Sequence, residues 1–207
     1  MTLTPLTGAD TAADRIALQA LVRFQQLTPL AGLRACDEAA WTARLAAFKA
    51  HSLAVSGQPA PEGKWSGLIE CALQQLVAGA LVQPQVALQP GLGIAGATAG
   101  PVTHDIAALL RVTPLDEAQE LDLAIRWWQL ARGAGLPVPD DFGECWRALE
   151  WVGLLRQLAL LPELQDADRA QALTTAVKVA LRYGPLKPLL VLLQPLSGVV
   201  PQAGYTF

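Results

Sequence analysis

Residues 71–104 contain no Asp, Glu, Lys or Arg, and this charge-free stretch limits the folds open to the chain. A helix that spans a membrane needs about 20 consecutive, mostly apolar residues. Gln and Pro interrupt the stretch at QPQ (83–85) and Pro90, and residues 188–207, which are also uncharged, are interrupted by three prolines. We therefore predict buried or loop-rich segments here and no membrane span.

Apolar residues at helical spacing predict a mainly α fold for most of the chain. The predicted helices begin at Asp10 or Thr11, Asp37, Ser66, Thr103, Asp116 and Asp140, and a last pair covers about 163–183 and 185–194. The stripes expected to face the core are Ile16–Ala20–Phe24 with Ala17 and Leu21 beside it, Trp41–Leu45–Phe48, and Leu121–Ile125–Trp128.

The predicted organisation is a single helical lobe over residues 1–207. Pro, Gly and polar residues dominate 55–64, which indicates a surface linker. Short β-favouring pieces at 86–88 and 92–94 stand between Pro and Gly. At most a small residual hairpin is expected there, within 84–98.

Charge and cysteine usage exclude several classes of partner and site. Only 16% of the residues are charged, the net charge is −3 and there are four Lys, so the basic footprint of a nucleic-acid-binding protein is missing. Cys36, Cys71 and Cys145 form no CxxC pair and are expected to be small buried hydrophobes in a reducing compartment. His51 and His104 cannot complete a zinc set, and no signal-peptide pattern is visible, so we expect a cytoplasmic protein.

Two segments carry a family resemblance: GPVTHDIAALLR at 100–111 and EWVGLLRQL at 150–158. They resemble the C-terminal lobe of the aminoglycoside phosphotransferase and choline kinase superfamily. The likeness is greatest to the bacterial kinases of N-acetylmuramate and N-acetylglucosamine. Weaker likeness extends along most of the chain, for example at ALRYGPLKPLLVLL (180–193). The resemblance implies a kinase-like helical C-terminal lobe whose N-terminal lobe, with its Gly-rich loop and Lys, is expected to be absent.

The resemblance also implies ATP and Mg²⁺ as cofactors, and these need positioned charges. The family's catalytic loop should follow QPQV (83–86), but this chain runs on through ALQ into PGLGIAGATAGP. The positions of the family's metal motif read Gly93, Ile94, Ala95 and Gly96. Because no carboxylate stands between Glu70 and Asp105, the Mg²⁺ ligands are missing. We therefore expect no cofactor and no activity for the chain alone.

Few other residues are candidates for a site. By resemblance, Asp105 anchors the backbone of the catalytic loop from a helix start, and the role left to it here is to stabilise that helix terminus. Glu150, Trp151 and Arg156 lie on the helix that the family uses for its substrate, with a solvated face or an intrachain pair as the alternative. We interpret the four tryptophans Trp127, Trp128, Trp146 and Trp151 as core residues rather than a ligand platform.

A dinucleotide site is a further pattern to weigh. Gly91, Gly93 and Gly96 match GxGxxG, but the strand–turn–helix context is poor and no acidic partner follows about 20 residues later. We reject this interpretation.

Three functional hypotheses follow. The leading one is a catalytically degenerate kinase lobe, a pseudoenzyme of bacterial type with a binding or interaction role or none at all. The second is an ATP-dependent phosphotransferase of amino sugars or aminoglycosides that acts only with a separate N-terminal lobe. The third is a helical scaffold that self-associates, or binds a protein partner, through an apolar face formed by the first helix and by Leu88, Leu92 and Ile94.

Overall fold

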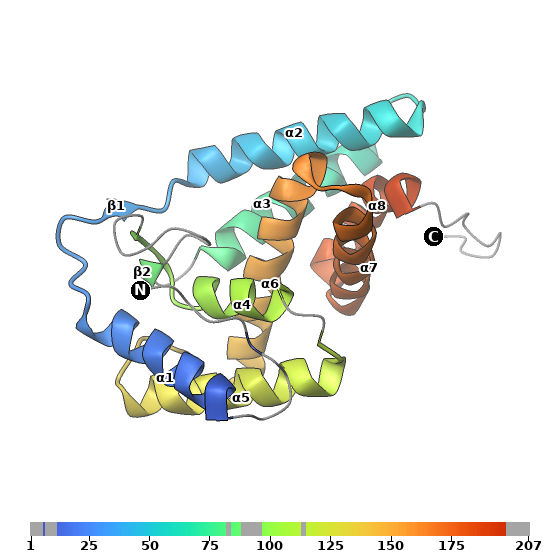
Figure 1. Cartoon of the computed structure of the whole chain (residues 1–207). Helices are drawn as coiled ribbons and strands as arrows, with labels where there is room; N and C mark the ends of the chain where they lie inside the picture. Colours follow the sequence, from blue (N-terminus) through green and yellow to red (C-terminus); the bar gives the residue numbers. More distant parts are fainter. Residues whose placement is uncertain (1–5, 7–11, 82–83, 88–96, 113–114, 198–207) are drawn as a thin grey trace. The chain divides into compact units, whose positions relative to one another are not determined.

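The structure is a computed structural model that describes Leu6 and residues 12–81, 84–87, 97–112 and 115–197. The mainly α class is confirmed, because helices make up most of these residues (Figure 1). The chain divides into two compact units: the first joins Met1–Cys36 to Ala80–Gly153, and the second joins Asp37–Gly79 to Leu154–Phe207. The single-lobe interpretation stays a prediction.

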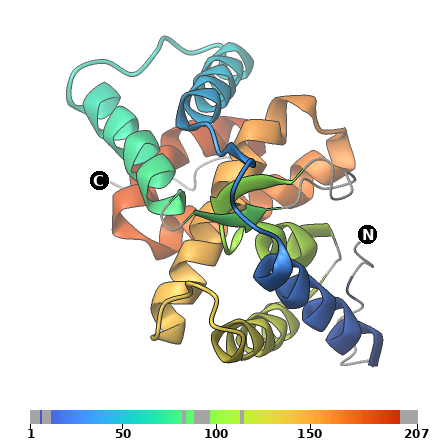
Figure 2. The ribbon, with the colours of Figure 1, turned by 90° about the vertical axis from the view of Figure 1, so that its left-hand side faces the viewer.

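The first unit combines helices with a small sheet. Its elements are α1 (Ala12–Leu27), β1 (Arg34–Ala35), β2 (Pro84–Ala87), β3 (Thr98–Pro101), α4 (His104–Val112), α5 (Glu117–Gly133) and the first part of α6 (Phe142–Leu160). The strand order is β1-β3-β2, with β3 parallel to β1 and antiparallel to β2. α1 packs along α5, as both views of the ribbon show (Figures 1 and 2).

The sheet differs in detail from the expected hairpin. β2 does pair with the chain that follows it, but the partner strand is β3 at Thr98–Pro101. The expected partner at 92–94 lies outside the described residues. The sequence also gave no sign of β1, a strand of two residues that pairs Arg34 with Thr98 and Ala35 with Ala99. Two residues are too few to show strand periodicity.

The predicted core stripe of α1 is correct at Phe24, Ala17 and Leu21 but wrong at Ile16, and that of α5 is displaced by one residue. Ile16 of α1 is 65% exposed, whereas the buried face carries Ala17, Leu18, Leu21, Val22 and Phe24 together with two polar residues, Asp14 and Gln25. Apolar periodicity cannot find a face that includes polar residues. In α5, Leu121 is 39% exposed and the buried residues are Leu123, Ala124, Trp127 and Ala131. Because Trp127 and Trp128 are adjacent, the sequence was compatible with either one on the buried face of the helix. Trp127 is the one that is buried.

The second unit is helical. Its elements are α2 (Glu38–Ser56), α3 (Lys64–Ala80), the rest of α6, η2 (Leu161–Glu163), α7 (Asp166–Arg182), η3 (Gly184–Leu189) and α8 (Leu190–Ser197). α8 packs against both α7 and α2, and the Ser52 hydroxyl donates to the Leu192 carbonyl oxygen across 2.5 Å. Leu45 and Phe48 are buried as predicted, while Trp41 is half-buried.

The helix ends follow capping rules. Asp37 caps α2 by accepting from the Ala40 N–H at 3.2 Å, and Gly57 ends the helix in the left-handed region at φ 60°. Since α2 continues to Ser56 and α3 begins at Lys64, the linker is shorter than predicted and covers 57–63. Asp116 caps α5 in a capping box with Gln119, as its place before the helix predicted.

The cysteines and the membrane expectation can be checked within the described residues. The three cysteines are free thiols; Cys145 is buried as predicted, but Cys71 is exposed and Cys36 is half-exposed. No described helix is both long and apolar enough to cross a membrane.

Candidate functional site

The start of α4 carries a cluster of buried polar residues in the first unit. Asp105 lies in the first turn of α4 and is 1% exposed. The Gln25 side-chain amide of α1 donates to Asp105 Oδ2 at 3.3 Å and to the Val102 carbonyl oxygen at 3.0 Å. His104 Nδ1 lies 3.5 Å from Asp105 Oδ1. The resembling segment is thus tied to α1 through one glutamine.

Burial makes these bonds necessary. A carboxylate or amide removed from water without hydrogen bonds costs several kcal/mol, roughly 2–7 for a neutral polar group. The first turn of α4 also supplies a favourable field for the Asp105 carboxylate. We missed Gln25 in the sequence, because a glutamine on an otherwise apolar helix gives no sign of being buried. The anchoring role of Asp105 stays a prediction that this geometry supports.

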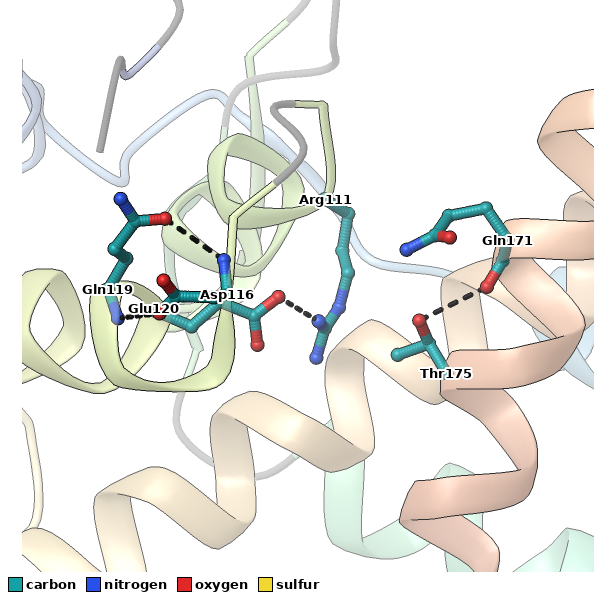
Figure 3. Close-up of polar contacts among 6 residues, drawn as sticks. All are labelled: Arg111, Asp116, Gln119, Glu120, Gln171 and Thr175. Atoms are coloured by element: carbon teal, nitrogen blue, oxygen red, sulfur yellow. Dashed lines mark hydrogen bonds and ion pairs between the residues drawn. The ribbon is translucent and has the colours of Figure 1, made fainter. Parts of the chain in front are cut away.

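The two resembling segments meet at Arg111. Its guanidinium pairs with Glu120 of α5 at 2.7 Å (Figure 3). A Cβ atom placed on Gly153 of α6 would lie 3.5 Å from Arg111 Nε. The segment that ends in Arg111 therefore contacts the EWVGLLRQL helix at its glycine, and Glu120 holds the arginine from the other helix.

Figure 3 also shows the Asp116–Gln119 capping box that starts α5 next to this arginine. The Asp116 carboxylate accepts from the Gln119 N–H at 2.9 Å, and the Gln119 side chain accepts from the Asp116 N–H at 3.0 Å. The same view includes the Thr175 hydroxyl of α7, which donates to the Gln171 carbonyl oxygen within the second unit. These contacts order helix ends and surfaces and bring no reactive groups together.

The proposed substrate-face residues are divided between the units. Glu150 and Trp151 belong to the first unit and Arg156 to the second. Glu150 is 3% exposed, so the solvated-face alternative is wrong for this residue, whereas Trp151 and Arg156 are half-buried. Their substrate role stays a prediction.

The tryptophans follow the core interpretation only in part. Trp127 is fully buried, but Trp128, Trp146 and Trp151 are half-buried. Phe142 lies between Trp128 and Trp146, with ring centroids at 5.5 and 6.2 Å. The Trp128 indole N–H donates to the Pro139 carbonyl oxygen, which fastens the α5–α6 connection. The cluster has a structural explanation.

The degenerate metal-motif positions Gly93, Ala95 and Gly96 lie outside the described residues, as do Leu88, Leu92 and Ile94. Within the part of the chain that is described, no three His, Cys, Asp or Glu residues gather where they could hold a metal ion.

Comparison with known proteins shows which proteins this chain resembles in sequence. Over 134 residues the chain is 36% identical to the N-acetylmuramate/N-acetylglucosamine kinase of Neisseria meningitidis serogroup B, covering 58% of this chain and 40% of that protein. Over 166 residues it is 30% identical to the kinase of the same name from Pseudomonas aeruginosa, covering 70% of this chain and 48% of that protein. The chain is a relative of amino-sugar kinases.

This relationship has limits in length and in structure. The chain spans less than half the length of these curated relatives. No family model matches it, and neither does any solved structure. The amino-sugar kinase resemblance of the sequence is confirmed, whereas the activity of the whole relatives is a matter for proposal.

Proposed function

We propose that this amino-sugar-kinase relative acts through binding or interaction and does not transfer phosphate with the residues it carries. The observation that supports this most is the absence of any carboxylate between Glu70 and Asp105. Within that interval the resembled kinases place both the catalytic Asp and the metal-binding acids.

The chemistry of phosphoryl transfer makes those acids necessary. Catalysis consists of positioning the reactants and stabilising charge, with Mg²⁺ held by an Asp and an Asn and a second Asp orienting the nucleophile. Mg²⁺ takes oxygen ligands, usually including one or two carboxylates. The sequence ALQPGLGIAGATAG at 87–100 offers no charged oxygen. No step through Mg²⁺ or ATP is therefore part of this proposal.

The comparison with the Pseudomonas aeruginosa kinase also supports a deletion. The match extends over 166 positions but covers 70% of a 207-residue chain, about 145 residues, so about 21 of the aligned positions have no residue of this chain. Part of the relative within the aligned region thus has no counterpart here. The missing catalytic loop is the deletion that the sequence itself points to. A bacterial origin and a cytoplasmic location stay proposals alongside it.

A kinase assay tests the proposal. Purified protein is incubated with ATP, Mg²⁺ and N-acetylmuramate, N-acetylglucosamine or an aminoglycoside, with the Neisseria meningitidis kinase as positive control. We expect no turnover above background, because the charges that stabilise the transition state are missing. Turnover of about 1 per second or more, the range of working kinases, would overturn the proposal.

The second candidate is a phosphotransferase that needs a separate N-terminal lobe. It is favoured by the relatives, which are named as N-acetylmuramate/N-acetylglucosamine kinases. A thermal-shift series with millimolar Mg-ATP separates the two candidates. A bound nucleotide raises the free energy of unfolding by RT ln(1 + [L]/Kd), so a surviving site would raise the melting temperature in a saturable way. We expect no shift. A saturable rise of several degrees would favour the second candidate.

A further inference from the structure

An open groove lies between α2 and α3 in the second unit. It has a volume of about 430 Å³. Its lining residues follow one face of each helix, at 38, 42, 45, 46, 49, 50 and 53 on α2 and at 70, 73, 74 and 77 on α3. The 57–63 loop joins the two helices at one end (Figure 2). Helical spacing on both walls is the arrangement that receives a third helix.

The chemistry of the groove is apolar with an acidic rim. Leu53 is half-buried and Ala46 and Ala50 are small and exposed, while Leu45, Leu73 and Val77 are buried beneath them and form the floor. The charged lining residues are Glu38 and Glu70 against Lys49, which pairs with Glu70. The lining therefore has a net negative charge. A matching helix would present aliphatic side chains and at least one positive charge.

α1 presents such a face. The residues at 16, 19, 20, 23 and 27 stand at the i, i+3, i+4, i+7 and i+11 positions of one stripe. Ile16 and Leu27 at its ends are 65% and 66% exposed, and Arg23 between them is exposed too. Isolated exposed aliphatic residues are ordinary, but two of this size on one stripe with a cation between them form an anchor pattern.

The stripe is shorter than the α2 wall of the groove. From Ile16 to Leu27 it extends about 16 Å at 1.5 Å per residue. The lining of the groove runs along α2 from Glu38 to Leu53, which is about 22 Å on the same measure. The stripe thus fits within this length, and its Arg23 is opposite in sign to the net charge of the lining.

We propose that α1 of one copy of this chain docks into the α2–α3 groove of a second copy. Each copy carries one stripe and one groove, so every copy can both present a helix and receive one. This proposal is independent of the proposed function, because it involves no residue of the kinase-like segment at 100–111. It assigns self-association to α1 and to a groove that sequence reasoning did not find.

Light scattering after size exclusion tests it, using the full chain and four variants. Leu27→Glu puts a charge on the stripe, and Leu181→Glu is its control, since Leu181 is a 53% exposed leucine of α7. Ala50→Glu puts a charge in the groove, and Ala47→Glu is its control, an exposed alanine of the same helix outside the lining. All four positions are exposed alanines or leucines, so circular dichroism should show each variant folded.

We expect the wild type to have a mass of at least two chains of 21.9 kDa at micromolar concentration. Leu27→Glu and Ala50→Glu should each weaken association about tenfold or more, because a charge placed against the apolar surface of a partner is desolvated there. The two controls should associate like the wild type. A wild-type monomer, or controls as impaired as the test variants, would overturn the proposal.

A mixture of the two variants provides the sharper test. Leu27→Glu keeps an intact groove and Ala50→Glu keeps an intact α1, so the mixture can form one of the two contacts. We expect partial return of the dimer in the mixture but in neither variant alone. Two variants that are each monomeric and stay monomeric when mixed would show that the stripe and the groove are not partners.

Discussion

The two compact units differ in what their interiors contain. In the first, the buried residues include the polar or charged side chains Asp14, Gln25, Thr103, His104, Asp105 and Glu150; in the described part of the second, Ser52 is the one buried polar residue. The interior of the second unit is otherwise apolar and, apart from Phe48, mostly aliphatic, with leucines from α6, α7, η3 and α8. The stability of the first unit therefore depends on hydrogen bonds between buried groups, and that of the second on close packing of apolar side chains.

The resembling segment GPVTHDIAALLR lies in the unit with the polar interior, where Gln25 and Asp105 are hydrogen-bonded. A buried polar group is stable only with its partners in place, so it specifies its neighbours more strictly than a leucine does. An aliphatic interior accepts any well-packed set of similar volume. Loss of one partner and loss of volume should therefore act differently in the two units.

The largest effect is expected from a cavity in the aliphatic interior. Leu158→Ala removes a side chain that is fully buried in the second unit and should lower the free energy of unfolding by about 2–5 kcal/mol. Leu181→Ala in the same unit changes a leucine that is 53% exposed and should cost well under half as much. Urea denaturation measures both. Equal losses would mean that the interior of this unit is not close-packed at Leu158.

A smaller effect is expected from removing one hydrogen-bonding partner in the first unit. Gln25→Ala leaves the Val102 carbonyl and one oxygen of Asp105 without this donor, which should cost about 1–3 kcal/mol. The adjacent Gln26→Ala is the control, because its amide donates to the Ala134 carbonyl oxygen from an exposed position. Urea denaturation of the two variants gives the difference in their free energies of unfolding, which reports the contribution of the buried hydrogen bonds. If the control loses as much, the polar interior is not what distinguishes this unit.

The smallest effect concerns alkaline pH and Cys145. Burial raises the pKa of this thiol from 9.0 to about 12. Between those values the folded state keeps the proton and the unfolded state loses it, so this contribution is complete below about pH 9 and is lost as the pH rises towards 12. The slope is at most about 1.4 kcal/mol per pH unit.

Urea denaturation at pH 8 and pH 10 measures that slope. Cys145→Ala removes the thiol and should show the shallower decline of the two proteins, because every other titrating group is common to both. The same decline in both proteins would mean that the thiol of Cys145 is not protected in the folded state.

The sequence predicted the elements better than their faces. Asp37 and Asp116 marked the starts of α2 and α5 because capping is a local interaction of three or four residues. The face of α1 was found only in part, since Gln25 and Asp14 are buried, and the face of α5 was misplaced, since Trp127 and Trp128 are adjacent apolar residues. Which side of a helix is covered depends on residues far along the chain, such as Val102 for Gln25.

The features of the candidate site that depend on residue type could be predicted from the sequence. Those that depend on contacts between residues far apart in the chain could not. The absence of carboxylates between Glu70 and Asp105 can be read directly from the sequence. The bond from Gln25 to Asp105 joins residues that are 80 positions apart, and the contact of Arg111 with Gly153 is also long-range. No local pattern encodes such pairs. The α2–α3 groove was missed for the same reason.

The three free thiols differ in solvent exposure, so their rates of reaction with a thiol reagent should differ. Cys71 is exposed and Cys36 is half-exposed, so a thiol reagent should modify them within its ordinary reaction time. Cys145 is buried and can react only from molecules in which its surroundings have opened. Mass spectrometry counts the attached groups, so the arrival of the third group times the opening of the first unit in the native protein, without denaturant and without an added probe.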